Sequence, residues 1–423
     1  MKSKYLVSCL TIVAGLSLFP RAVMADVVVK WQPGDNAANI QKAIDSGDST
    51  IIIPKAAKPW LVGETIYAKR PNQKIVFKPG VLLAAQEGAF QATTENMITV
   101  LADNVSLSGY KATLKMRKAD YQNPNLYQPS SFRHIIVLRG ARNFVVEGLT
   151  LEDAGGDGIF ISHGQVENDE IPVRKYSSGV VRDVLSKNNH RLGMSIMSAQ
   201  DLLVENSTFQ GSSGTKPSSG VDIEPDHDWQ KLVNINLINN KFINNDRNGI
   251  QMGLARYRGS NVSDISISFD GCTSTGNGED GISINAHDPG FTDGPKGFID
   301  VKNCNIASSG EHGVFIKSDH QDPANTFKIS FDNITLNNTA TKSTEFFPIN
   351  FQNSLEPGVV CNIDFGNNFS ITDNKSRPPL FANGPARKQG ITNVHGTIRV
   401  NNDLKTEPVL GDRLNNVTLK FID

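Results

Sequence analysis

The sequence predicts an all-β fold, a parallel β-helix covered at its N-terminal end by a short helix. The main observation is a phrase, a glycine followed by alternating apolar and polar residues, that recurs along the middle of the 423-residue chain. The phrase begins at Gly158, Gly193, Gly220, Gly249, Gly281 and Gly313, at spacings of 35, 27, 29, 32 and 32 residues. Repeats of this length indicate a solenoid, in which each coil buries its apolar face by stacking on its neighbours.

Two further observations identify the repeating unit as a strand followed by turns. Each phrase alternates with period two, so that Val221 and Ile223 point to one side while Asp222 and Glu224 point to the other. Asparagine pairs such as Asn188-Asn189 separate the strand-like pieces, as expected where a coil turns a corner. Stacking one such strand per coil gives a parallel β-helix.

The elements around the phrase follow in order. Apolar residues at helical spacing behind an acidic start predict a helix over Asp35–Asp45, placed to cover the first coil. Early strands are expected at Thr50–Ile53, Lys74–Phe77, Val81–Ala84, Met97–Val100 and His134–Leu138. Polar segments that break the repeat are expected to be loops, at 116–133, 163–175 and 287–296. Residues 339–423 keep strand-like pieces and should form the last coils and a cap, so 26–423 is predicted to be a single domain.

The N-terminus is typical of an exported protein. Lys2 and Lys4 precede the apolar stretch Tyr5–Phe19, and Ala25 ends a small-residue site, which predicts a signal peptide over residues 1–25 cleaved after Ala25. The mature protein is expected to be secreted or periplasmic, without a membrane span and monomeric. Removing three basic residues takes the net charge from −1 to −4, which argues against a general nucleic-acid binder.

Two cysteines occupy equivalent positions on consecutive coils, because Cys272 and Cys304 each lie nine residues before a repeat glycine. Stacked coils place them about 4.8 Å apart. An exported protein could join them in a disulfide, or they could be small buried thiols. No CxxC pair is present, so the sequence does not indicate a cysteine metal site.

Three stretches resemble a known superfamily. The opening Asn39-Ile-Gln-Lys-Ala-Ile-Asp-Ser-Gly, the following Ile-Ile-Ile-Pro strand and the later Ser219-Gly-Val-Asp-Ile-Glu-Pro resemble the pectate-lyase-like superfamily of right-handed parallel β-helix proteins. That superfamily contains polysaccharide lyases, glycoside hydrolases, uronan epimerases and phage tailspikes. The stretch Asn188–Ile196 followed by Gly-Val-Asp-Ile-Glu-Pro is most similar to the β-helical alginate lyases, which implies a uronic-acid polymer as substrate.

The repeat also predicts where a site would lie. The outward residues two positions after each glycine should form a row about 4.8 Å apart: Phe160, Ser195, Asp222, Gln251, Ser283 and Phe315. Ionisable residues converge on the coils of Gly193, Gly220 and Gly249. The candidates for catalysis are His190, Arg191, Lys216, Asp222, Glu224 and Arg247. The candidates for substrate binding are Gln251, Tyr257, Arg256, His227, Asn285 and Lys317.

These residue types suit β-elimination at a uronate, which needs a group to neutralise the carboxylate, a base and an acid. Arg191, Arg247 or Gln251 could neutralise, and His190 or Lys216 could be the base. The resemblance to alginate lyases implies a tyrosine acid, for which Tyr257 and Tyr176 are available. A plainer interpretation is that the arginines only balance the charges of Asp222 and Glu224.

Other activities stay open. Asp222 and Glu224 are neighbours on one strand, about 7 Å apart at Cα, where crowding should raise one carboxyl pKa, and the pair could serve a hydrolase. An epimerase shares the proton abstraction step, and a non-catalytic glycan-binding protein is a further alternative. No cofactor is expected to be required, although Ca²⁺ could be bound where Asp226 and Asp228 follow the pair. The expected partner is an anionic polysaccharide.

Overall fold

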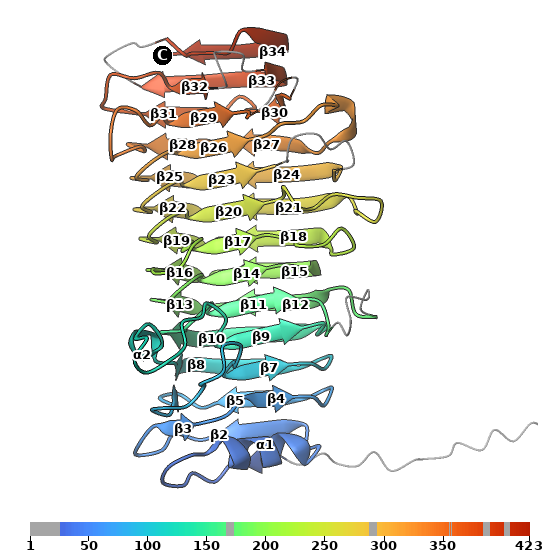
Figure 1. Ribbon diagram of the computed structural model, residues 1–423, viewed down its shortest axis with the longest axis vertical. Helices are drawn as coiled ribbons and strands as arrows, with labels where there is room; N and C mark the ends of the chain where they lie inside the picture. The colour runs from blue at the N-terminus through green and yellow to red at the C-terminus, as the bar shows by residue number, and fades with distance from the viewer. Residues whose placement is uncertain are drawn as a thin grey trace, which may run out of the picture.

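The computed structural model describes residues 26–165, 173–286, 294–354, 356, 358–383, 390–401 and 407–423. Over this part of the chain the polypeptide winds into a tall column of stacked coils, with α1 at one end and the last strands at the other (Figure 1). All strand pairings between named strands are parallel, which confirms the predicted β-helix. The predicted signal peptide, residues 1–25, lies outside the described residues.

One sheet, here called sheet B, takes one short strand from each coil. Its pairings run in chain order, so neighbouring strands belong to neighbouring coils. Its described strands are β4 (Ile66–Ala68), β7 (Ile98–Val100), β9 (Ile136–Arg139), β11 (Ile159–Ser162), β14 (Met194–Ile196), β17 (Val221–Ile223), β20 (Ile250–Gly253), β23 (Ile282–Asn285), β26 (Val314–Lys317), β29 (Ile349–Gln352) and β32 (Leu380–Asn383).

The remaining strands form sheet A, which turns a corner and so supplies two further walls. Its first row holds β1 (Asp26–Val28), β2 (Thr50–Ile53), β5 (Lys74–Phe77), β12 (Ser177–Arg182), β15 (Ala199–Glu205), β18 (Leu232–Ile238), β21 (Ile265–Asp270), β24 (Gly297–Lys302), β27 (Lys328–Asp332) and β30 (Val360–Asp364). Its second row holds β3 (Trp60–Val62), β6 (Leu82–Ala85), β13 (Leu185–Lys187), β16 (Thr208–Gln210), β19 (Lys241–Ile243), β22 (Thr273–Thr275), β25 (Asn305–Ala307), β28 (Ile334–Asn337) and β31 (Phe369–Thr372). Four long strands span both rows: β8 (Ser106–Lys115), β10 (Phe144–Glu152), β33 (Gly390–Asn401) and β34 (Arg413–Ile422).

The repeat glycines are required by the corner that leads into sheet B. A Cβ at Gly249 would collide with the Ser274 side chain and lie 2.7 Å from Asn277 Nδ2 and 2.9 Å from the carbonyl of Gly281. The Ser274 hydroxyl donates to that same carbonyl at 2.9 Å, and Asn277 donates to Ser274. Glycine is therefore needed because the corner is filled by polar side chains that satisfy buried backbone groups.

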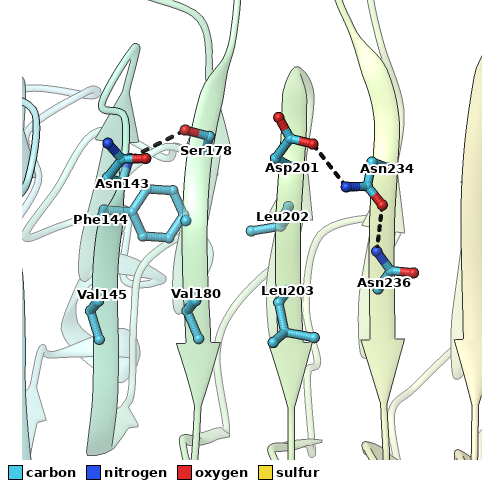
Figure 2. Close-up of a pocket in the computed structure, with 11 residues that line it drawn as sticks. Asn143, Phe144, Val145, Ser178, Val180, Asp201, Leu202, Leu203, Asn234 and Asn236 are labelled. Carbon is cyan, nitrogen blue, oxygen red and sulfur yellow. Dashed lines mark hydrogen bonds between the residues drawn. The ribbon is translucent and has the colours of Figure 1, made fainter.

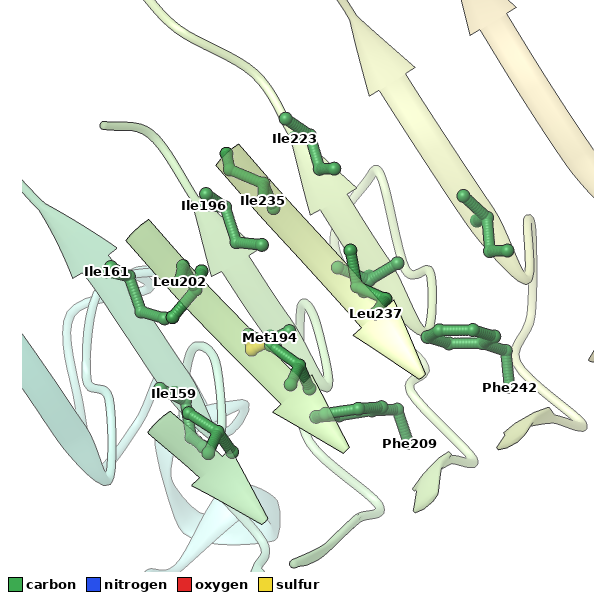
Figure 3. Packing of buried hydrophobic residues seen from close by; sticks show 14 of the residues in the cluster. Ile159, Ile161, Met194, Ile196, Leu202, Phe209, Ile223, Ile235, Leu237 and Phe242 are labelled. Carbon is green, nitrogen blue, oxygen red and sulfur yellow. The ribbon is translucent and has the colours of Figure 1, made fainter. Parts of the chain in front are cut away.

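The core is a continuous apolar column inside the coils. The inward residues of sheet B face those of sheet A (Figure 3). Residues labelled in that view are Ile159, Ile161, Met194, Ile196, Leu202, Phe209, Ile223, Ile235, Leu237 and Phe242. Phe209 and Phe242 stack on adjacent coils with ring centroids 5.7 Å apart. Because each coil repeats the same inward pattern, the outward residues are held in fixed rows.

The helices match or extend the expectations. Helix α1 (Ala37–Asp45) starts two residues later than predicted, because the Asp35 carboxylate accepts from the Ala37 N–H at 2.8 Å in the turn before it. Its buried residues Ile40 and Ile44 cover the first coil. The loop over 116–133 carries a short helix, α2 (Lys118–Tyr121), and a 3-10 helix, η1 (Pro323–Asn325), lies later in the chain. None of the described helices is long and apolar enough to cross a membrane.

Of the two alternatives for the cysteines, a disulfide or a pair of buried thiols, the structure has the buried thiols. Cys272 and Cys304 are both free and buried, and their thiols interact across adjacent coils. Each thiol also donates to a backbone carbonyl, Cys272 to Leu237 at 3.3 Å and Cys304 to Lys302 at 3.0 Å. The pair therefore fills an interior position of two consecutive coils.

Candidate active site

The outer face of sheet B carries the predicted row. Ser195 pairs with Phe160 on one side and with Asp222 on the other, and Asp222 pairs with Gln251. The row continues through Ser283 to Phe315. The register counted from the glycines is therefore confirmed, and it places Asp222 in the middle of β17, between β14 and β20, with Glu224 directly after the strand.

Asp222 is the most unusual group on this face. Its side chain is buried, with 1% of the residue exposed, and neither carboxyl oxygen accepts a hydrogen bond from a donor among the described residues. Burial and the adjacent carboxylate of Glu224 raise the pKa of Asp222 well above its usual range, against the opposing effect of Arg191. Both effects favour the protonated form of Asp222, whose hydroxyl can donate to the neighbouring Glu224 carboxylate.

Arg191 lies beside the carboxyl pair and is held by Asp157. Its Nη1 donates to Asp157 Oδ2 at 3.1 Å and to Ser195 Oγ at 3.3 Å, and Ser195 Oγ donates to the same Asp157 oxygen at 2.7 Å. Asp157 is fully buried and the Arg191 side chain is 12% exposed. Among the described residues, no hydrogen bond uses Arg191 Nε or Nη2, so these donors are available to a bound anion.

A histidine supports Asp157 from the preceding coil. His134 Nδ1 accepts from the Asp157 backbone N–H at 2.9 Å and lies 3.4 Å from Asp157 Oδ2, while its ring stacks on Phe160 with centroids 4.8 Å apart. Burial lowers the pKa of His134 to about 4. His134 is therefore neutral at neutral pH, with its proton on Nε2.

Asp157, Ser195 and His134 were not among the sequence candidates. Ser195 belongs to the predicted row, but an uncharged serine on an outer strand gives no signal of a functional role. Asp157 precedes Gly158 directly, at a position held in the other coils by Leu192, Ser219, Asn248, Asp280 and His312. Asp157 and Asp280 are both buried acidic residues at this corner, and the signal for Asp157 is that it lies one coil before Arg191.

The 116–133 loop forms one wall beside this face. Lys118 Nζ donates to Asn188 Oδ1 at 3.1 Å and to Ser213 Oγ at 2.6 Å, and Arg133 donates to three backbone carbonyls of the coil edge and the loop. These bonds fix the loop, and Phe132, which is 50% exposed, lies 6.0 Å above the Arg191 guanidinium. An exposed ring is thereby placed at the rim of the carboxyl pair.

The opposite wall is made of aromatic and basic side chains. Trp229 is buried between His227, whose ring stacks on it at 5.1 Å, and His163, whose ring meets it edge-on at 4.9 Å. His227 is exposed to solvent, as expected for a substrate-binding candidate. Arg256 is also exposed and pairs with Asp226 at 3.4 Å.

Several sequence candidates lie away from the carboxyl pair. His190 is bonded to Gln122 at 2.5 Å and Thr215 at 2.8 Å, so it faces the α2 side, and burial lowers its pKa. Lys216 is exposed on the turn before β17. Arg247 is committed to Glu279, 2.6 Å away, and not to the carboxyl pair.

Four sequence candidates remain. Tyr257 is buried, whereas Gln251, Asn285 and Lys317 lie on the outer face of sheet B. The Tyr257 hydroxyl donates to the Gln230 carbonyl at 2.7 Å and accepts from the Ser263 N–H at 3.2 Å, so it is turned into the loop and not towards the carboxyl pair. The expectation that Tyr257 binds substrate or acts as the acid is therefore wrong. Burial raises the pKa of Tyr257 to about 12. Gln251 lies next to Asp222 and accepts from Asn248 at 2.8 Å. Asn285 and Lys317 are partners in register two and three coils beyond Glu224.

The acidic turn after β17 is already occupied by protein contacts. Asp226 pairs with Arg256, and Asp228 accepts from Asn261 N at 3.3 Å and Nδ2 at 3.0 Å. Over the part of the chain that the structure describes, no three acidic, histidine or cysteine side chains converge as a metal site. The calcium hypothesis therefore has no preformed donor cluster to support it in these residues.

A separate groove of about 450 Å³ lies on sheet A, across β10, β12, β15 and β18 (Figure 2). Val145, Val180 and Leu203 line it, and a chain of hydrogen bonds joins Asp201, Asn234 and Asn236 at one end. These polar groups satisfy one another, and the groove has no counterpart of the Asp222 pair. The face of sheet B is therefore the better candidate for chemistry.

Comparisons with known proteins extend the fold assignment. No protein-family model matches the sequence. The uncharacterized protein YclG of Bacillus subtilis (strain 168) is 23% identical over 180 residues, which span 40% of this chain and 30% of that protein.

Solved structures align over nearly the whole chain. The family 28 exopolygalacturonase of Yersinia enterocolitica aligns with a TM-score of 0.57 and 12% identity, covering 94% of this chain and 78% of that one. The A-module of the mannuronan C-5 epimerase AlgE6 of Azotobacter vinelandii aligns with a TM-score of 0.50 and 14% identity, covering 91% and 95%. Together with the parallel sheets, these likenesses show that the chain has the right-handed parallel β-helix fold.

Proposed function

We propose that the protein is a polysaccharide lyase that cleaves a uronic-acid polymer by β-elimination on the outer face of sheet B. The observation that carries the proposal is the pair formed by the buried Asp222 and the partly exposed Glu224 beside Arg191, in which burial and the Glu224 carboxylate favour the protonated form of Asp222. Such a pair offers an acid and a base within one strand, and the free donors of Arg191 offer a site for the substrate carboxylate.

The reaction can be written so that the pair regenerates itself. Arg191 binds the uronate carboxylate and stabilises the negative charge that develops when the C5 proton leaves. Glu224, which is partly exposed, takes that proton, the C4–C5 double bond forms and the bond from C4 to the glycosidic oxygen breaks. Asp222 gives its proton to the departing oxygen, a step that requires the bound substrate to displace the side chains that cover this carboxyl. The pair ends with the proton on Glu224, and transfer back to Asp222 restores the starting state.

Asp157 and Ser195 are positioning residues in this scheme. Both fix Nη1 of Arg191, so its remaining donors keep one orientation towards the face above Asp222. Since Asp157 balances one positive charge of the site, Asp222 is left without a cation of its own. That arrangement keeps Asp222 protonated and ready to act as an acid.

A hydrolase is the second candidate. An inverting hydrolase places its carboxyl groups roughly 6.5–9.5 Å apart to admit a water molecule. The side chains of Asp222 and Glu224 instead interact directly, and this contact favours elimination over hydrolysis. The names of two similar structures, a polygalacturonase and a mannuronan epimerase, refer to polymers of uronic acids and so support the substrate class.

The test is to incubate the purified protein with alginate, polygalacturonate, a glycosaminoglycan and a neutral mannan. Lyase activity would give the ultraviolet absorbance of the unsaturated uronate together with new reducing ends. Reducing ends without absorbance would replace the lyase proposal by hydrolysis, and deuterium incorporation from D₂O without cleavage would replace it by epimerisation. An Asp222→Asn variant should be inactive, while the control Asp332→Asn, on an exposed position of sheet A, should retain full turnover.

We infer that turnover needs no added cofactor, since the proton transfers and the carboxylate contact are all assigned to side chains. Dialysis against EDTA should therefore leave the rate unchanged. A rate that falls with EDTA and returns with Ca²⁺ would reinstate the calcium hypothesis for the turn that contains Asp226 and Asp228.

A further inference from the structure

An arginine on the same face of sheet B has no acidic partner among the residues that the structure describes. We propose that Arg139 forms an anion-binding subsite, which holds the carboxylate or sulfate of an acidic sugar a few units away from the bond that is cleaved. The inference rests on the proposed function in one respect, namely that the polymer lies along the outer face of sheet B.

The position of Arg139 follows from the register. It ends β9 and pairs with Ser162 of β11, and the same line continues through Met197 to Glu224. Ser162 and Met197 are buried under neighbouring side chains, so of these four residues Arg139 and Glu224 are the two that are partly exposed. Three coils separate Arg139 from Glu224, which corresponds to roughly 14 Å along the column. A polymer that follows this line and presents one sugar to Glu224 therefore brings a later sugar to Arg139.

The missing partner distinguishes Arg139 from other arginines of the molecule. Arg174, Arg182 and Arg247 each form an ion pair with an aspartate or glutamate at 2.6–2.7 Å. Arg139 is partly buried, yet no ion pair or side-chain hydrogen bond joins it to any described residue. Burial lowers the pKa of Arg139, and the charge that opposes this effect comes from the Tyr67 hydroxyl and from no described carboxylate. A partly desolvated guanidinium without a counter-ion is costly, and an anionic ligand would remove that cost.

The surroundings of Arg139 favour an anion. Burial lowers the pKa of His163, and the positive charge of the nearby Arg139 lowers it further. The Lys69 ammonium lies 4.7 Å from the ring centroid of Tyr67, and Tyr67 is exposed on β4. The planar fork of arginine binds carboxylates and sulfates through two hydrogen bonds, and an exposed tyrosine beside it can contact the sugar ring.

The experiment measures binding separately from turnover. In a Glu224→Gln background, which should not cleave, calorimetry would compare oligogalacturonate, oligomannuronate, a chondroitin sulfate oligosaccharide and a neutral manno-oligosaccharide. Adding Arg139→Gln should weaken the acidic ligands by about 10-fold or more and leave the neutral ligand unchanged. Arg139→Lys should weaken them by a smaller factor, because it keeps the charge but loses the fork. The control Arg182→Gln removes the same charge from sheet A and should have no effect.

The ligand series identifies the anion. Loss confined to the two uronates assigns a carboxylate subsite, and loss confined to the sulfated ligand assigns a sulfate subsite. Equal affinities for Arg139→Gln and Arg182→Gln would overturn the proposal, as would equal losses for acidic and neutral ligands. An Arg139-dependent affinity in a protein that cleaves no uronate would instead refute the lyase proposal and keep the subsite.

Discussion

Replacing Asp222 by asparagine should abolish turnover and at the same time change how stability depends on pH. The folded protein holds a proton on Asp222 at a pH where an unfolded aspartate, with its ordinary pKa near 3.8, has lost it. Between those two pKa values the folded state binds one proton more than the unfolded state. Raising the pH through this window therefore destabilises the fold by about 1.4 kcal/mol per pH unit for this group. Asparagine cannot titrate, and its amide can donate to Glu224 as the protonated carboxyl does.

The measurement is chemical unfolding of the wild-type protein and of Asp222→Asn at pH 5, 6 and 7. The wild-type free energy of unfolding should fall relative to that of the variant by about 1.4 kcal/mol per pH unit as long as Asp222 stays protonated in the folded state. Turnover should drop by about 10²-fold to 10⁴-fold, as expected when a general acid is lost. Parallel pH dependences for the two proteins would show that Asp222 is ionised in the folded state, and the proton-sharing mechanism would then fail.

Three further changes probe neighbouring parts of the structure. Asp157→Asn should lower the turnover number by about 10-fold to 100-fold without removing any reacting group, because Arg191 loses its anchor; an unchanged turnover number in steady-state kinetics would contradict this. Burial lowers the pKa of His312 to about 4, against an ordinary value of 6.5. The free energy of unfolding should therefore fall by up to about 3 kcal/mol as the pH falls from 7 to 4. His312→Asn should lack that acid sensitivity when unfolding is followed by circular dichroism. Gly249→Ala should destabilise the fold by at least about 1–3 kcal/mol because of the collision with Ser274, and a thermal midpoint equal to that of the wild type would refute the explanation of the repeat.

The sequence predicted the fold and the rows because both follow from a local repeat. In each repeat, the residues two and four positions after the glycine point outward. The neighbours of Asp222 on adjacent coils could therefore be predicted from the sequence. Even the crowding of Asp222 by Glu224 follows from their positions two residues apart on one strand. These are consequences of strand geometry, which the chain carries in its pattern.

The partners of the site could not be predicted in the same way. Whether Arg191 meets Asp157 or Asp222 depends on side-chain directions at a corner, and whether Arg247 meets Glu279 depends on the next coil. Tyr257 lies in a loop outside the repeat, where the alternation of a strand does not show which side chains point outward. Its burial therefore could not be predicted, and it does not have the expected role. The loop that carries Lys118 folds back over a coil about 70 residues later in the chain, a contact that no local pattern encodes.

The balance of charge explains why Asp157 matters to a reaction that it does not touch. Three carboxyl groups, those of Asp157, Asp222 and Glu224, lie around the single guanidinium of Arg191. Asp157 takes up that positive charge through a direct ion pair, which leaves the buried Asp222 to retain a proton. Asp157→Asn would release Arg191 towards Asp222 and so lower the pKa of the proposed acid. The variant should then lose the fall in stability with rising pH that marks the wild-type Asp222, although every group assigned to proton transfer is still present. If the variant kept the wild-type dependence of stability on pH, burial alone would hold the proton on Asp222, and the ion pair between Arg191 and Asp157 would not contribute.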